Sequence, residues 1–294
     1  MESLTLLLDA KNELGEGPVW DVEDQAIYWV DIMRPSVHRL VLASAAHTEW
    51  RMPKAVGCLA LRRAGGALVA LADGFYSLDL ESGEVNPCHQ LPEPEVGGRL
   101  RFNDGKCDRI GRFWAGTADG VQKDYVVPGA LYRYDPDGTC RAVLRDVGNP
   151  NGIGWSPDNT TMYFADTLAR QILAFDFDLP TGALANRRLF AQDGPKDGCP
   201  DGLTVDSEGC VWSAKWDGWK VVRYSPKGDI VSQIRMPVPR PTSCVFGGPD
   251  LCQLIITSAR MWLSDKELRE APNSGGLFIA DVGISGVAEP RFLG

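Results

Sequence analysis

The sequence predicts an all-β fold, a six-bladed β-propeller, and three observations lead to it. Related segments recur about every 40 to 50 residues, which is the spacing of propeller blades. Within each segment, short strands that alternate apolar and polar residues are separated by turns containing Pro, Asp or Gly. Helical patterns are nearly absent, whereas a doubly wound fold needs long amphipathic helices between its strands. We therefore expect a single propeller domain over residues 1–294.

Each repeat begins with a short apolar strand, continues through a polar turn, and adds a strand rich in aromatic and β-branched residues. The first residues of the six repeats are Glu16, Val56, Asn103, Asn151, Asp201 and Thr242. A ring of six such units leaves few exposed sheet edges. The apolar segment Leu4–Leu8 precedes the first repeat, and we expect it to pair into the last blade near GGLFIAD and so close the ring. One helix of one or two turns is expected in SDKELREA, from Ser264.

Composition excludes several function classes. The formal net charge is −9 and Lys and Arg are not clustered, so neither nucleic acid nor an anionic membrane is an expected partner. No apolar stretch approaches the roughly 20 residues that cross a bilayer, and the N-terminus lacks the basic region of a signal peptide. We expect a cytoplasmic protein with reduced, mostly buried cysteines. The oligomeric state stays open.

The first residues of the repeats are also the candidate functional residues. Innermost propeller strands line the central channel, so equivalent positions form a ring around one axis. Glu16, Asn103, Asn151 and Asp201 bring carboxylate or amide oxygens to that ring. Asn-Gly or Asp-Gly alone is typical of a turn, but recurrence at one repeat position favours a site for a hard cation. Such oxygens suit Ca²⁺, Mg²⁺ or Mn²⁺ and tolerate Zn²⁺ or Fe²⁺, so the metal stays unassigned.

Six motifs carry a family resemblance. In order along the chain they are LGEGPVW, RFNDGK, GRFWAGT, NGIGWSPD, PDGLTVDSEG and TSCVFGGPD. From about Leu14 to the C-terminus the chain resembles senescence marker protein 30 (regucalcin), gluconolactonase and related sugar lactonases. The resemblance implies a six-bladed propeller with one divalent metal bound by Glu16, Asn151 and Asp201. It also implies that Asp201 is the general base and that Arg101 and Asn103 bind substrate.

The implied reaction is hydrolysis of a five- or six-carbon aldonolactone, a small-molecule sugar lactone, to its aldonic acid. The metal polarises the lactone carbonyl, and Asp201 accepts a proton from the attacking water. Asp104 is a less favoured second base. The animal proteins carry a longer acidic loop with a substrate-contacting Glu after GRFWAGT, and Asp119 is the nearest replacement here.

Two alternatives remain beside this prediction. One is a phosphotriester-type hydrolase that uses the same metal site, and the other is a non-catalytic calcium-binding propeller. Three tryptophans, Trp216, Trp219 and Trp262, are candidates for the channel mouth, although packing between blades is the more ordinary role of such residues.

Overall fold

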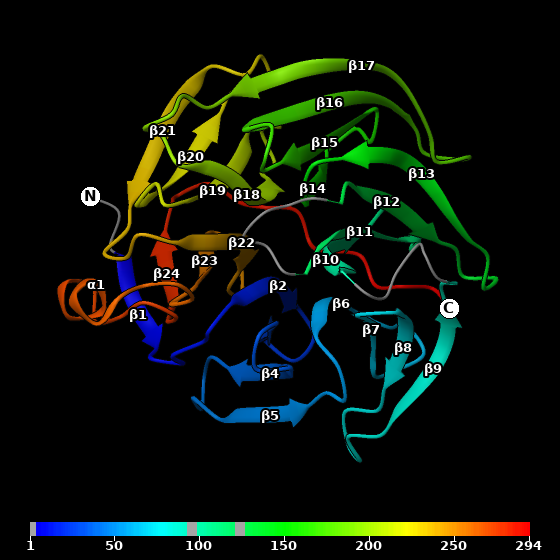
Figure 1. The fold of residues 1–294 in the computed structure, drawn as a ribbon, viewed down its shortest axis with the longest axis horizontal. Coiled ribbons are helices and arrows are strands. Elements are labelled where there is room, and N and C mark those ends of the chain that lie inside the picture. Colours follow the sequence, from blue (N-terminus) through cyan, green and yellow to red (C-terminus); the bar gives the residue numbers. More distant parts are fainter. Residues whose placement is uncertain (1–3, 93–98, 121–126) are drawn as a thin grey trace.

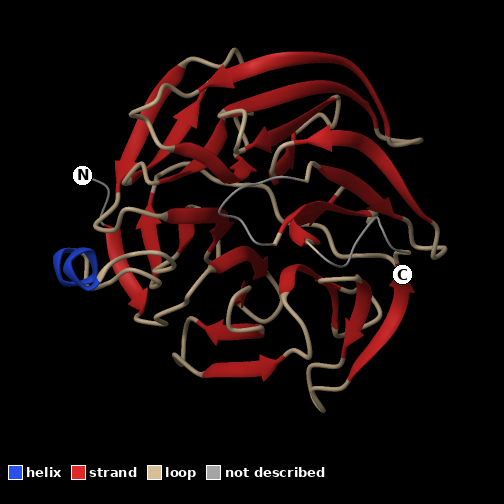
Figure 2. Cartoon of the chain, viewed as in Figure 1, coloured by secondary structure: helices blue, strands red, loops and turns tan. Residues whose placement is uncertain are grey.

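The computed structural model describes residues 4–92, 99–120 and 127–294. Within them, the strands form six four-stranded antiparallel sheets arranged as a ring (Figures 1 and 2). We number the blades one to six in chain order. Blade one consists of β2 (Gly15–Asp21), β3 (Ala26–Asp31), β4 (Ser36–Val41) and β5 (His47–Arg51). Blade two consists of β6 (Val56–Leu61), β7 (Ala67–Leu71), β8 (Gly74–Leu78) and β9 (Val85–Gln90). Blade three consists of β10 (Leu100–Cys107), β11 (Phe113–Asp119), β12 (Gly129–Tyr134) and β13 (Cys140–Val147). Blade four consists of β14 (Pro150–Trp155), β15 (Thr161–Asp166), β16 (Gln171–Asp178) and β17 (Ala183–Gln192). Blade five consists of β18 (Cys199–Val205), β19 (Val211–Trp216), β20 (Lys220–Tyr224) and β21 (Ile230–Arg235). Blade six consists of β22 (Pro241–Gly247), β23 (Gln253–Ser258), β24 (Leu277–Asp281) and the N-terminal strand β1 (Leu4–Leu8).

The N-terminal strand closes the ring, as the sequence predicts. Strand β1 pairs antiparallel with β24, so that Leu4 lies opposite Ala280 and Leu8 opposite Leu277. The sixth sheet therefore joins the two ends of the chain in the order β1-β24-β23-β22. Both the six-bladed propeller and its closure are confirmed.

The predicted helix is also present as α1 (Asp265–Glu270). It begins in a capping box, because the Ser264 hydroxyl accepts from the Glu267 amide while the Glu267 carboxylate accepts from the Ser264 amide. No helix in the described ranges has the length and apolar character needed to span a membrane. All eight cysteines lie in these ranges and none forms a disulfide; four of them are buried and Cys88 is exposed, so fewer are buried than the sequence predicts.

Apolar side chains of neighbouring blades pack against each other at each of the six blade interfaces. Large aromatic side chains fill several of these interfaces. Between blades three and four, for example, Trp114 and Trp155 meet edge to face with ring centroids 6.0 Å apart. Because each blade packs on two neighbours, the inner strands are held at fixed positions around the channel.

The C-terminal segment, residues 282–294, runs across the ring in red in Figure 1. It contacts several blades in turn. Gly286 donates to the Leu251 carbonyl of blade six, Glu289 pairs with Lys106 of blade three, and Arg291 pairs with Asp21 of blade one. The segment thereby links blades that are distant in sequence.

Candidate active site

Every inner strand is irregular at the point where a repeat begins. Pairing of β10 with β11 skips from Phe102 to Gly105, and pairing of β14 with β15 skips from Pro150 to Ile153. Strand β18 has the same interruption between Pro200 and Leu203. Such bulges turn a side chain out of the regular alternation of the strand. They leave Asn103, Asn151 and Asp201 in unpaired positions at the channel.

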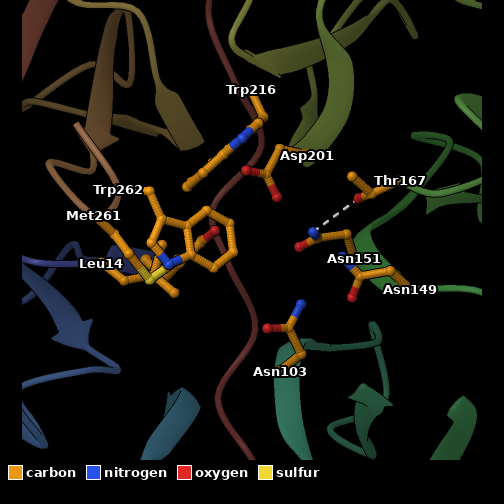
Figure 3. A pocket seen from close by; sticks show the side chains of 10 residues that line it. Leu14, Asn103, Asn149, Asn151, Thr167, Asp201, Trp216, Met261 and Trp262 are labelled. Carbon is orange, nitrogen blue, oxygen red and sulfur yellow. Dashed lines mark hydrogen bonds between the residues drawn. The ribbon is translucent and has the colours of Figure 1, made fainter. Parts of the chain in front are cut away.

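These residues and Glu16 line one cavity of about 50 Å³, which is enough for a few water-sized groups (Figure 3). The remaining lining residues among those described are Leu14, Asn149, Thr167, Trp216, Met261 and Trp262. Residues of blades one, three, four and five thus bring oxygen atoms together, as the repeat pattern predicts. Gly152 permits this convergence, because a Cβ there would lie 2.5 Å from the Leu203 amide nitrogen and 2.6 Å from the Asp201 carbonyl oxygen.

The orientation of the Asn151 side chain is fixed by a chain of two hydrogen bonds. Its amide nitrogen donates to Thr167 Oγ1 at 3.0 Å, and Thr167 Oγ1 donates to the Pro200 carbonyl at 2.8 Å. Because the hydroxyl proton is used on Pro200, Thr167 must accept from Asn151, which turns Asn151 Oδ1 away from it. That oxygen is buried and has no hydrogen-bond partner.

Asp201 presents a second such atom. Its Oδ1 is buried without a hydrogen-bond partner, and the residue is only 3% exposed. Burial raises the pKa of Asp201 well above its usual value, and the nearby Asp104 carboxylate adds to the increase. Glu16 is affected in the same way, because burial first and Asp201 second raise its pKa. The protein therefore holds two mutually repelling carboxyl groups in a site that disfavours their charge.

Asn103 lies in the same cavity, but both ends of its amide are bound. Its nitrogen donates to the Pro150 carbonyl at 2.9 Å, and its oxygen accepts from Arg101 Nη1 at 2.8 Å. Arg101 is buried, and its positive charge lowers the pKa of Glu16 against the effect of burial. Arg101 thus holds the Asn103 side chain in place by a hydrogen bond and is not among the residues that line the cavity. The predicted contact of Arg101 with substrate stays a prediction.

The other predicted residues lie apart from this cavity. Asp119 is fully buried and pairs with Arg99, whose Nη2 lies 2.8 Å from Asp119 Oδ2. Its predicted contact with substrate is untested, and part of the loop that follows, residues 121–126, lies outside the described residues. Asp104 lines a second cavity together with Lys106 and Glu289, and burial raises its pKa to about 6.

Four residues that line the cavity are not predicted from their repeat position: Leu14, Asn149, Thr167 and Met261. Asn149 directly precedes β14, the inner strand of blade four, and Thr167 directly follows β15, the second strand. The Thr167 amide donates to the Asn149 carbonyl. In the sequence, only their proximity to NGIGW and to the end of MYFAD indicates a role at the site. Of the three candidate tryptophans, Trp216 and Trp262 line the cavity, whereas Trp219 does not.

The donor set fits a hard divalent cation. Two buried amide and carboxylate oxygens, Asn151 Oδ1 and Asp201 Oδ1, lack partners, and the Glu16 carboxyl lies in the same cavity. Unsatisfied buried oxygens are costly, and a cation would satisfy them while offsetting the repulsion between the carboxylates. No three His, Cys, Asp or Glu side chains form a ligand cluster in the described parts of the chain, so an amide oxygen is required to complete this set.

Comparison with known proteins gives a consistent result. The family model for the SMP-30/gluconolactonase/LRE-like region matches residues 14–260. The chain is 39% identical to a 6-deoxy-6-sulfogluconolactonase of Pseudomonas putida, covering 100% of this chain and 99% of that protein. It is also 39% identical to an L-arabinolactonase of Azospirillum brasilense, covering 99% and 95%. A solved calcium-binding protein, regucalcin, from Agrobacterium tumefaciens superposes with a TM-score of 0.92 at 30% identity, covering 98% and 96%.

Proposed function

The chain belongs to the SMP-30/gluconolactonase/LRE-like family, and on that premise we propose that it is a metal-dependent sugar lactonase. Its substrate is a five- or six-carbon aldonolactone, which it hydrolyses to the aldonic acid. Two relatives of 39% identity are named 6-deoxy-6-sulfogluconolactonase and L-arabinolactonase, which supports this substrate class.

The observation that carries the proposal is the pair of unpartnered buried oxygens, Asn151 Oδ1 and Asp201 Oδ1, in one cavity with Glu16. We propose these three residues as the ligands of one divalent cation. When bound, that cation supplies Lewis-acid polarisation of the lactone carbonyl. Oxygen donors alone do not select among Ca²⁺, Mg²⁺, Mn²⁺, Zn²⁺ and Fe²⁺.

The chain's own residues provide the remaining chemistry. Asp201 accepts a proton from the water that attacks the carbonyl carbon. When the C–O bond of the lactone then breaks, Asp201 returns this proton to the ring oxygen, which leaves as a hydroxyl. The buried cavity strengthens each of these interactions because few water molecules compete for them. Arg101 keeps the amide of Asn103 in position at the wall of the cavity.

A panel of aldonolactones tests the proposal. Metal-stripped protein is assayed after each of the five cations is restored, with an activated phosphotriester in the same panel. We expect hydrolysis of at least one lactone to depend on the added cation, and Asp201→Ala to abolish it. Equal rates in stripped and restored protein would contradict metal dependence. Full activity of metal-restored Asp201→Ala would contradict the assigned base.

A further inference from the structure

The cavity has two chemically different walls. Asn103, Asn149, Asn151 and Thr167 lie on one side in Figure 3, whereas Leu14, Trp216, Met261 and Trp262 lie on the other. Asp201 lies between the two groups, and the carboxyl group of Glu16 also lines the cavity. A cavity of this kind complements a ligand that has polar edges and an apolar face.

The tryptophans are arranged as a rigid pair. Their ring centroids lie 6.0 Å apart with the planes at 77°, an edge-to-face contact. Arg240 secures this pair, since its guanidinium carbon lies 4.8 Å from the Trp216 ring centroid. Arg240 is held in turn by the Asp217 carboxylate at 2.6 Å and by the Met261 carbonyl, next to Trp262.

Trp262 has two further unusual features. It is 52% exposed, although tryptophan contributes more apolar surface than any other residue type when buried. Its backbone lies in the left-handed region at φ +61°, which is a true outlier for a bulky side chain. Strained backbone of this type is found at ligand clamps, but Trp219 shares it, so the position of Trp262 in the cavity lining is what distinguishes it.

We infer that Trp262 is a specificity-determining residue that stacks on the apolar C–H face of the lactone ring. The inference rests on the proposed lactonase function and deepens it, because it selects cyclic sugar lactones over open-chain esters. Because the cavity holds only a few water-sized groups and Trp262 is half exposed, the ring lies at its mouth, with the hydroxyl and carbonyl edge toward the amide wall and the C–H face on the indole. Trp216 supports the indole from the side, and Arg240 positions Trp216.

The test compares Trp262→Ala, Trp262→Phe and Trp219→Ala. Trp219 is a matched control, because it is 40% exposed, has a left-handed backbone at φ +56° and lies outside the cavity lining. For the lactone that the wild type hydrolyses, we expect Trp262→Ala to raise KM about 5- to 20-fold while kcat changes less than about 2-fold. Trp262→Phe should restore most of the affinity, and Trp219→Ala should behave as wild type.

Two further measurements separate the possible failures. Hydrolysis of an acyclic ester should be insensitive to Trp262→Ala, and binding of a non-hydrolysable sugar lactam, followed by calorimetry, should weaken by the same factor as KM rises. An inactive wild type counts against the proposed function, and the lactam titration still decides the role of Trp262. Unchanged KM and unchanged lactam affinity in folded Trp262→Ala would overturn the inference.

Discussion

The side chain of Asn151 donates a hydrogen bond of 3.0 Å to Thr167 Oγ1. Thr167 also donates to the carbonyl of Pro200, so one hydroxyl links the Asn151 side chain to the backbone directly before Asp201. Replacing a group that hydrogen-bonds a metal ligand and so orients it commonly lowers metal affinity by about 10- to 100-fold. Thr167 is therefore expected to control the site without contacting the cation itself.

Thr167→Val tests this role. The substitution keeps the shape but removes the acceptor, so the Asn151 amide is free to rotate and its oxygen no longer has one fixed direction. We expect metal affinity, measured by calorimetry on stripped protein, to fall about 10-fold or more. Thr161→Val on strand β15 of the same blade is the control. Equal metal affinity of both variants would show that the Thr167 hydroxyl does not orient the site.

How far the sequence predicts this molecule depends on the type of residue considered. The fold follows from repeated strands, and the convergence of Glu16, Asn103, Asn151 and Asp201 follows from their shared repeat position. Both are properties of the repeat itself, because equivalent strands of a propeller meet at one axis. The bulges in β10, β14 and β18 reinforce the pattern by turning these side chains from the strand.

The remaining wall of the cavity belongs to residues outside the shared repeat position, two of them in connections between strands of one blade. Thr167 follows the end of β15, and Trp262 follows β23 in a left-handed conformation that no local sequence rule favours for tryptophan. Asp119 illustrates the opposite problem. The family resemblance predicts that Asp119 contacts substrate, which stays a prediction, and in the structure Asp119 pairs with Arg99, the residue directly before β10. Such pairings depend on tertiary packing and are not encoded in the repeat.

The buried pair of Lys215 and Asp193 is predicted to stabilise the strand next to Asp201. Lys215 Nζ lies 2.6 Å from Asp193 Oδ2, and the Lys215 side chain is fully buried. Burial lowers the pKa of Lys215 in spite of this carboxylate. Lys215 also lies opposite Pro200 in the β18–β19 pairing. Removing one member of such a pair leaves a buried charge without compensation.

We expect Lys215→Met to lower the free energy of unfolding by roughly 3 to 5 kcal/mol, as measured by urea denaturation. Lys220→Met is the matched control, because Lys220 pairs with the exposed Asp197 at 3.5 Å. Exposed pairs contribute about 1 kcal/mol or less. A similar small loss in both variants would contradict the stabilising role of the Lys215–Asp193 pair.

The C-terminal segment is predicted to contribute to stability through Phe292. This side chain is 3% exposed, and its ring stacks on Tyr134 with centroids 5.5 Å apart. Its amide donates to the Leu61 carbonyl at 2.8 Å. Phe292→Ala should lower the free energy of unfolding by about 3 to 5 kcal/mol, because truncation leaves a cavity between blades two and three. The neighbouring Leu293 is 46% exposed, so Leu293→Ala should cost about 0.5 kcal/mol or less.

A pair of histidines on blade one predicts a pH dependence of stability. His38 Nδ1 lies 3.1 Å from His47 Nε2, and His38 Nε2 lies 2.9 Å from Ser36 Oγ. The His38 ring also stacks on Trp29, with centroids 5.0 Å apart. Burial, together with the His47 ring, lowers the pKa of His38 to about 4, although Glu49 and Asp31 oppose this effect.

The sign of the effect follows from the two protonation equilibria. Between pH 6.5 and about 4 the unfolded chain binds a proton at His38 that the folded chain does not bind. Stability is therefore lost as the pH falls through this range, by at most about 3 kcal/mol from this residue. His38→Gln removes the titrating group, so its free energy of unfolding should approach or exceed that of wild type as the pH falls from 7 to 4. His89→Gln, outside the stacked pair, is the control. Urea denaturation at stepped pH measures the difference, and a gap between wild type and His38→Gln that stays constant over this range would disprove the coupling.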